Sequence, residues 1–202
     1  MERKEHWENI YTTKSPQEVS WTQAIPQVSL DFIRSFGQDT SASIIDIGGG
    51  DSHLVDFLLD AGYTDITVLD ISSKALERAQ ERLGDRAQNV KWIVSDIVNF
   101  HPSTSYDIWH DRAVFHFLTE AAEIERYVQL VNESVNHNMV IGTFSENGPL
   151  KCSGLEITQY SKSVLSDRFN TGFETINCIQ IDHTTPFETT QNFTFCSFAK
   201  EQ

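Results

Sequence analysis

The chain has 202 residues, of which 15 are Lys or Arg and 29 are Asp or Glu, so its formal net charge at pH 7 is −14. This length suits one compact domain, and we expect a single domain over residues 1–202. An acidic surface repels phosphate backbones and anionic lipids, which argues against nucleic acid and membranes as partners. The charged N-terminus lacks an apolar export segment, and no apolar stretch reaches the roughly 18 residues of a membrane span.

The three cysteines, Cys152, Cys178 and Cys196, are odd in number and form no CxxC pair. This pattern predicts neither a disulfide framework nor a zinc site, and no metal is expected. A reducing, cytoplasmic location fits best.

Apolar periodicity predicts that helices and strands alternate along most of the chain. The first predicted helix is amphipathic and spans residues 22–36, with Thr22 as its N-cap and Pro26 in its first turn. Strands are expected over residues 44–47, 66–69, 90–94, 106–111 and 139–144, and further helices over residues 54–61, 72–83 and 119–135. Such alternation forces parallel pairing through right-handed crossovers.

The end of the chain follows a different pattern. After a helix near residues 158–169, two strand-like stretches, residues 173–181 and 192–199, are separated only by a turn around Pro186. This gap is too short for a helical crossover, so the pair should form an antiparallel hairpin. The predicted fold is therefore α/β, a Rossmann-like three-layer α/β/α sandwich whose seven-stranded, mostly parallel sheet ends in an antiparallel C-terminal hairpin.

A glycine-rich turn follows the first predicted strand, with Asp46 before it and Gly48, Gly49 and Gly50 within it. An open α/β sheet places its ligand crevice at such a turn. Glycine permits a sharp bend and lets a ligand approach the backbone closely. The alternative is a tight strand-to-helix connection that binds nothing.

Carboxylates also stand at the ends of the second and third predicted strands, as Asp70 and Asp96. A carboxylate at the end of the second strand can accept both hydroxyls of a ribose. Each acid taken alone is typical of a helix cap or a solvated turn. Acids at three successive strand ends, Asp46 included, favour a nucleoside-containing ligand.

The turn differs from a dinucleotide site because the third glycine of GxGxxG is missing and Asp51 stands where a pyrophosphate would bind. S-adenosylmethionine has no phosphate, and its ammonium and sulfonium are both attracted by acids. A Tyr-x-x-x-Lys pair is also absent, which disfavours a short-chain reductase.

With these features the chain resembles the class I S-adenosylmethionine-dependent methyltransferases over nearly its whole length. The resemblance implies S-adenosylmethionine as cofactor and S-adenosylhomocysteine as product. The cofactor-binding residues that it implies are Asp46, Gly48, Gly49, Gly50, Asp70, Ile71, Asp96 and Ile97. The first four would surround the methionine moiety, the next two the ribose and the last two the adenine. Ser52 replaces the last glycine of the family pattern DxGxGxG.

The N-terminal segment is similar to that of small methyltransferases with a Trp-x-x-x-Tyr and a later Ser-Trp, here Trp7 to Tyr11 and Ser20-Trp21. This group includes the lysine methyltransferases of elongation factor and citrate synthase type and uncharacterised bacterial relatives. The resemblance implies that residues 1–40 lid the cofactor, with Tyr11 and Trp21 beside it. Alternatively, the aromatic side chains only pack the first helix onto the sheet.

Methyl transfer needs positioning and, for some acceptors, removal of a proton. Candidate catalytic residues after the fourth strand are Asp111 and His110, with His116 nearby. Alternatively, Asp111 pairs only with Arg112, and His116 is a satisfied buried histidine.

Residues 41–145 form the expected cofactor half and residues 146–202 the substrate side, where the loop 145–156 is long enough to cover an acceptor pocket. The acceptor, a small molecule or a protein, and the oligomeric state stay open. The competing functions are a non-catalytic sensor or partner subunit that binds the adenosyl ligand and, less favoured, an NAD-linked oxidoreductase.

Overall fold

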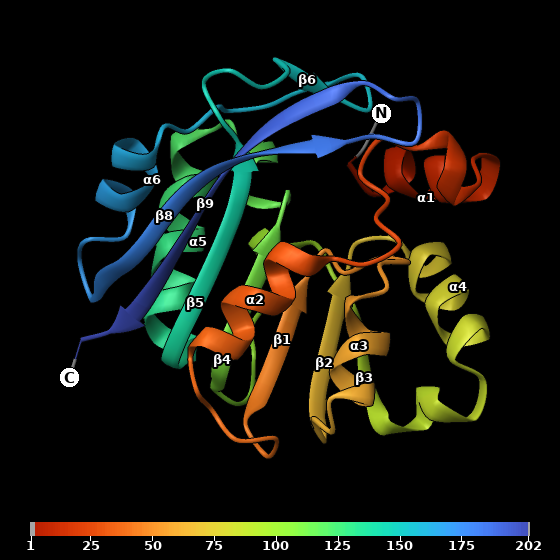
Figure 1. Ribbon diagram of the computed structural model, residues 1–202, viewed down its shortest axis with the longest axis horizontal. Helices are drawn as coiled ribbons and strands as arrows, with labels where there is room; N and C mark the ends of the chain where they lie inside the picture. Colours follow the sequence, from red (N-terminus) through yellow and green to blue (C-terminus); the bar gives the residue numbers. More distant parts are fainter. Residues whose placement is uncertain (1–2, 202) are drawn as a thin grey trace.

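A computed structural model describes residues 3–201 (Figure 1). Its centre is a seven-stranded sheet with the strand order β3-β2-β1-β4-β5-β9-β8. The strands are β1 Ser43–Ile47, β2 Asp65–Asp70, β3 Val90–Val94, β4 Tyr106–Arg112, β5 Val135–Phe144, β8 Phe173–Thr184 and β9 Thr190–Lys200. The α-helices are α1 Arg3–Thr13, α2 Gln27–Ser35, α3 Leu54–Asp60, α4 Ser73–Leu83, α5 Ala121–Ser134 and α6 Lys162–Arg168. A separate short hairpin consists of β6 Lys151–Cys152 and β7 Leu155–Glu156.

The strand directions confirm the predicted fold class. β3, β2, β1, β4 and β5 are all joined by parallel pairing. β9 runs antiparallel to both β5 and β8, which makes β8 and β9 the edge hairpin that the short gap predicts. The hairpin occupies one edge of the sheet because the connection between its strands cannot cross a sheet face.

Helices cover both faces of the sheet, because side chains alternate between faces along each strand. Ile44 and Ile108 pack into a cluster with α2, α3 and α4. Ile45 and Trp109, their neighbours in sequence, pack with α5 and α6 on the opposite face. The helix layers of Figure 1 therefore follow from two apolar faces on the central strands.

Two helices begin several residues after their predicted starts, and one α-helix was not predicted. α2 begins at Gln27 with Pro26 as its N-cap, so Thr22 belongs to the preceding loop and does not cap the helix. α6 begins after Ser161, whose hydroxyl accepts a hydrogen bond from the backbone N–H of Val164. The additional helix is α1, which buries only three of its residues and therefore has a weak apolar period.

The structure corrects the expectation that the cysteines form no disulfide. Cys178 and Cys196 are joined between β8 and β9, where the strand register pairs them directly and their Cα atoms are 4.2 Å apart. Sequence spacing does not reveal this pairing, because only the hairpin register makes the two residues neighbours. The expected cytoplasmic location therefore loses the support that it took from the cysteines. Within residues 3–201, no helix is long and apolar enough to cross a membrane.

Candidate functional site

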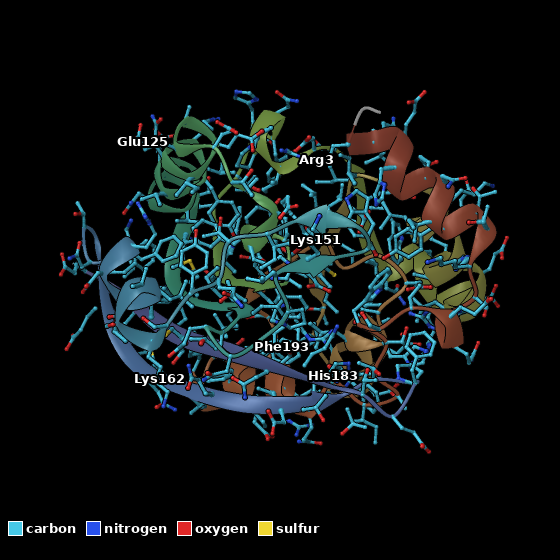
Figure 2. All side chains as sticks on the ribbon, turned by 90° about the horizontal axis from the view of Figure 1, so that it is seen from above. Arg3, Glu125, Lys151, Lys162, His183 and Phe193 are labelled. Atoms are coloured by element: carbon cyan, nitrogen blue, oxygen red, sulfur yellow. A yellow bond between two sulfur atoms is a disulfide. The ribbon has the colours of Figure 1, made fainter. Side chains whose placement is uncertain are left out.

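The carboxyl ends of β1, β2, β3 and β4 open into a cavity of about 460 Å³. α1 and residues 16–26 form its other wall. Figure 2 views the molecule from above, with Arg3 at the start of α1 and Lys151 on the β6–β7 hairpin. The chain leaves β1 toward β2 and β3 and returns to β4 on the other side of β1. The cavity therefore lies at the point where strand order reverses, which is the usual ligand position in open α/β sheets.

The structure brings most of the predicted site residues to this cavity. Those that line it are Tyr11, Trp21, Asp46, Gly48, Gly49, Asp70, Ile71, Asp96, Ile97 and His110. Gly50 and Asp111 are not among the lining residues.

The glycine turn is shaped by contacts within the protein. Gly48 and Gly50 have φ values of 63° and 50°, in the left-handed region that favours glycine. A Cβ atom on Gly48 would overlap the side chain of Val114, and one on Gly50 would stand 2.7 Å from the Tyr11 hydroxyl oxygen. The turn thus needs glycine to let two other chain segments approach, in addition to any ligand.

A buried polar chain joins β1, β4 and α2 beside the turn. The strand register pairs Asp46 with His110. His110 Nδ1 lies 2.6 Å from Asp46 Oδ1, and its Nε2 lies 2.8 Å from the Ser29 hydroxyl. Nδ1–H donates its hydrogen bond to the carboxylate, and in the neutral ring Nε2 then accepts one from the Ser29 hydroxyl. Both ring nitrogens are therefore engaged, so His110 has no free nitrogen to act as a base.

Asp70, at the end of β2, is a buried carboxyl group without a cationic partner among residues 3–201. Its Oδ1 accepts a hydrogen bond of 2.8 Å from the backbone N–H of Ser72. Burial raises the pKa of Asp70 to about 7, although that hydrogen bond opposes the rise, and the nearby Asp51 and Asp46 raise it further. The free protein therefore leaves this carboxylate short of hydrogen-bond donors.

Asp96, at the end of β3, is held by the N-terminal helix. Its carboxylate caps residues 97–99 by accepting from the Val98 N–H, and it forms an ion pair of 3.2 Å with Arg3. Arg3 also pairs with Glu123 on α5 at 2.7 Å. This bridge ties α1 to Asp96, the residue that the resemblance places beside the adenine. A lone arginine so far from Asp96 in sequence gives no signal for it.

Glu8 makes a second tie between α1 and the sheet. Its carboxylate accepts hydrogen bonds from the Ser73 N–H at 2.8 Å and from the Ser72 hydroxyl at 2.9 Å. A carboxylate at a helix N-terminus satisfies free N–H groups and interacts favourably with the helix dipole. α1 is therefore anchored on α4, directly beside Asp70.

Aromatic side chains of the N-terminal segment pack together over the cavity. The ring centroids of Trp7 and Trp21 are 5.7 Å apart, and those of Tyr11 and Trp21 are 6.3 Å apart. Leu155 of the β6–β7 hairpin packs against this cluster, and Cys152 lines the cavity. The aromatic residues thus both pack α1 and face the cavity, and the loop 145–156 contributes to the same wall.

Asp111 lies away from the cavity, on the α5 face of β4. It is fully buried and accepts hydrogen bonds from the Tyr127 hydroxyl at 2.6 Å and from the Val114 N–H at 2.9 Å. Phe115 also donates its backbone N–H to this carboxylate. Its partner is therefore Tyr127 and not Arg112, because successive strand residues face opposite sides of the sheet.

This placement predicts that Asp111 stabilises the fold. Asp111→Asn would turn an amide N–H₂ toward donors that the carboxylate now satisfies, so we expect the free energy of unfolding to fall by about 1 to 3 kcal/mol. Urea denaturation would measure this loss, with Asp31→Asn on the exposed side of α2 as the control. A tenfold loss of turnover at unchanged stability would instead show that Asp111 takes part in the reaction.

His116 is also withdrawn from the cavity, and burial together with the charge of Arg112 lowers its pKa to about 3. Arg112 does line the cavity, although the sequence suggested only a partner for Asp111. Its position at the carboxyl end of β4 was the available signal.

Comparison with known proteins agrees with this geometry. Residues 45–140 match the protein family described as "Methyltransferase domain". A curated relative, malonyl-[acyl-carrier protein] O-methyltransferase 1 of Ilyobacter polytropus, is 38% identical over 55 residues, which are 27% of this chain and 20% of the relative. The chain thus matches only about a fifth of that relative's length.

Solved structures share the fold over nearly the whole chain. A SAM-dependent methyltransferase from Anabaena variabilis superposes with a TM-score of 0.76 at 14% identity, covering 100% of this chain and 96% of that one. The N-methyltransferase NodS from Bradyrhizobium japonicum, in complex with S-adenosylhomocysteine, superposes with a TM-score of 0.70 at 16% identity, covering 87% of both chains.

Asp46, Asp70 and Asp96 all lie inside the matched segment, at the strand ends that open into the cavity. Residues 45–140 are therefore similar to a methyltransferase domain. The chain as a whole has the Rossmann-like α/β fold of these solved structures.

Proposed function

We propose that this chain is an S-adenosylmethionine-dependent methyltransferase that transfers a methyl group to a small-molecule or protein acceptor. The observation that carries the proposal is that three strand-end carboxylates, Asp46, Asp70 and Asp96, line one cavity beside the glycine turn. All three belong to the segment that matches a methyltransferase domain.

The cavity fits this cofactor in size and in polarity. Its volume of about 460 Å³ lies in the range of small-molecule sites. The buried Asp70 carboxylate accepts a hydrogen bond from the Ser72 N–H, and a ribose that donates two hydroxyl hydrogen bonds would supply further donors. The acids suit an ammonium and a sulfonium, whereas they would repel a pyrophosphate.

The resemblance and the cavity together support one assignment of the lining residues. In this assignment Asp70 with Ile71 holds the ribose, Asp96 with Ile97 holds the adenine, and Asp46 with Gly48 and Gly49 surrounds the methionine moiety. Gly50 shapes the turn beneath Tyr11.

When bound, the cofactor supplies a methyl group activated by its positively charged sulfur. Tyr11 and Trp21 would exclude water from that end of the cavity, and the strand ends would orient the acceptor. His110 is bonded to Asp46 and Ser29, so we assign it the positioning of Asp46 and no transfer of a proton.

Two resemblances suggest two different methyl acceptors. The Trp7 to Tyr11 and Ser20-Trp21 pattern suggests a protein lysine, as in the methyltransferases that it resembles. The Ilyobacter relative is by name an O-methyltransferase of malonyl-[acyl-carrier protein]. A non-catalytic binder of the adenosyl ligand is the alternative outcome.

Titration calorimetry with S-adenosylhomocysteine tests cofactor binding, with NADH as the competing ligand. We expect a dissociation constant in the micromolar range for the first and weaker binding of NADH. NADH binding tighter than S-adenosylhomocysteine would overturn the proposal. A cell lysate with methyl-labelled cofactor then tests catalysis, because a protein that binds but labels nothing is the non-catalytic alternative.

A further inference from the structure

Four arginine side chains line the cavity, and three of them are neutralised by nearby carboxylates. The paired arginines are Arg3 with Asp96, Arg78 with Asp51 and Arg82 with Asp56. Arg112 is different, since no carboxylate in residues 3–201 lies within salt-bridge distance of it. A cation that lacks its counter-ion in an otherwise acidic protein calls for a functional explanation.

The guanidinium of Arg112 is only partly satisfied by the protein. Its Nη1 donates a hydrogen bond of 2.9 Å to the backbone oxygen of Trp21, and its Cζ lies 5.4 Å from the ring centroid of Phe193. Its Nη2 is buried and has no hydrogen-bond partner among the described residues. Native proteins rarely leave a buried donor unpaired, because the loss of hydration costs about 1 to 3 kcal/mol and more for a charged group.

Two of the titratable groups beside Arg112, Cys152 and His183, carry no negative charge at neutral pH. Burial raises the pKa of the Cys152 thiol to about 12, and burial lowers the pKa of His183. Asp46 is the acid whose charge acts on Arg112, but its Oδ1 is engaged by His110. Burial lowers the pKa of Arg112 only to about 10, so the guanidinium stays charged at neutral pH.

The position of Arg112 separates it from the cofactor acids in the sheet. Asp70 ends β2 and Asp96 follows β3, whereas Arg112 ends β4 on the other side of β1. In Figure 2, Phe193 and His183 lie with the β8–β9 hairpin, apart from Arg3 at α1. Arg112 thus stands where β4, the β6–β7 hairpin and β9 meet, toward the part of the chain expected to receive the acceptor.

We propose that Arg112 binds a carboxylate at this end of the cavity, and that the methyl acceptor carries it. A guanidinium presents two parallel N–H groups to a carboxylate, and Nη2 provides the donor that the protein leaves free. The identification of the bound molecule as the methyl acceptor rests on the proposed function, but the carboxylate site can be tested without turnover. The same chemistry is present in the amino-acid carboxylate of the cofactor, so the test must separate these two sources.

The first measurement is calorimetric titration of malonate, a small dicarboxylate probe, into protein saturated with S-adenosylhomocysteine. We expect Arg112→Gln to weaken malonate binding by about tenfold or more. Arg112→Lys should bind malonate with intermediate affinity, because lysine keeps the positive charge but lacks the two parallel N–H donors of the guanidinium. Arg34→Gln, an exposed arginine on α2, is the control for the change of net charge and should bind malonate like the wild type.

The second measurement compares S-adenosylhomocysteine with 5′-methylthioadenosine, which lacks the amino-acid part. If the acceptor supplies the carboxylate, Arg112→Gln should bind both nucleosides like the wild type. A selective loss of S-adenosylhomocysteine affinity would assign Arg112 to the cofactor and overturn the acceptor assignment. Unchanged affinity for malonate in folded Arg112→Gln, or no malonate binding by the wild type, would overturn the carboxylate site. If the wild type binds no S-adenosylhomocysteine, the proposed function fails, and malonate titration of the free protein still tests Arg112.

Discussion

Asp70→Ala is expected to weaken S-adenosylhomocysteine binding by about 2 to 4 kcal/mol, which is roughly 30-fold to 700-fold in the dissociation constant. The proposed ribose contact consists of two hydrogen bonds to a charged acceptor, and each is worth about 1.5 to 3 kcal/mol. Calorimetry measures the change directly. Asp31→Ala, which removes an exposed carboxylate of α2, is the matched control and should leave the affinity unchanged. An unchanged constant for folded Asp70→Ala would refute the cofactor assignment.

The raised pKa of Asp70 provides an independent check on the same residue. Because its pKa is about 7 in the folded protein and 3.8 ordinarily, ionising it costs folding free energy. That cost is absent below the ordinary pKa and fully present above about 7. Asp70→Asn should therefore unfold with a free energy at least about 1 kcal/mol above that of the wild type at pH 8, and the gain should shrink toward pH 4.

The affinity of the wild type for S-adenosylhomocysteine should also depend on the charge of Asp70. Binding favours the ionised carboxylate, so affinity should fall as the pH falls below about 7, where the free protein takes up a proton. Asp70→Asn should bind weakly, without this dependence. A wild-type affinity that stays constant from pH 8 to pH 5 would show that the carboxylate does not meet the ligand.

Gly48→Val is expected to abolish cofactor binding and to destabilise the protein. The substitution places a β-branched side chain at a φ of 63° and forces it into the side chain of Val114, which lies in the turn after β4. Calorimetry and urea denaturation measure the two effects, and we expect a loss of affinity of at least about 100-fold.

Gly37→Val is the matched control for this prediction, because Gly37 has a φ of 66° and a Cβ atom added there would meet no other atom within 4 Å. Both variants suffer the strain of the left-handed region, about 1 to 2 kcal/mol, and only Gly48→Val adds the overlap. Adding Val114→Ala to Gly48→Val removes the overlapping methyl groups and should recover part of the stability. Normal binding by folded Gly48→Val would mean that the turn has no part in the site.

Much of the site was predictable because parallel strands bring their carboxyl ends to one edge. Asp46, Asp70 and Asp96 are far apart in sequence, yet each follows an apolar run that local periodicity identifies as a strand. Once the runs alternate with helices, the handedness of the crossovers sends all three carboxylates to the same edge. The hairpin of β8 and β9 was predictable for a similarly local reason, the short gap between its strands.

The remaining features depend on which residues meet across the fold. The sequence determined that Asp46, Asp70 and Asp96 stand at or next to strand ends, since periodicity and turn chemistry act over a few neighbouring residues. Only the tertiary structure decided that His110 engages Asp46, that Asp111 turns away toward Tyr127, and that Cys178 meets Cys196. These outcomes depend on strand register and on the face to which a side chain points, and a shift of one residue would reverse each of them.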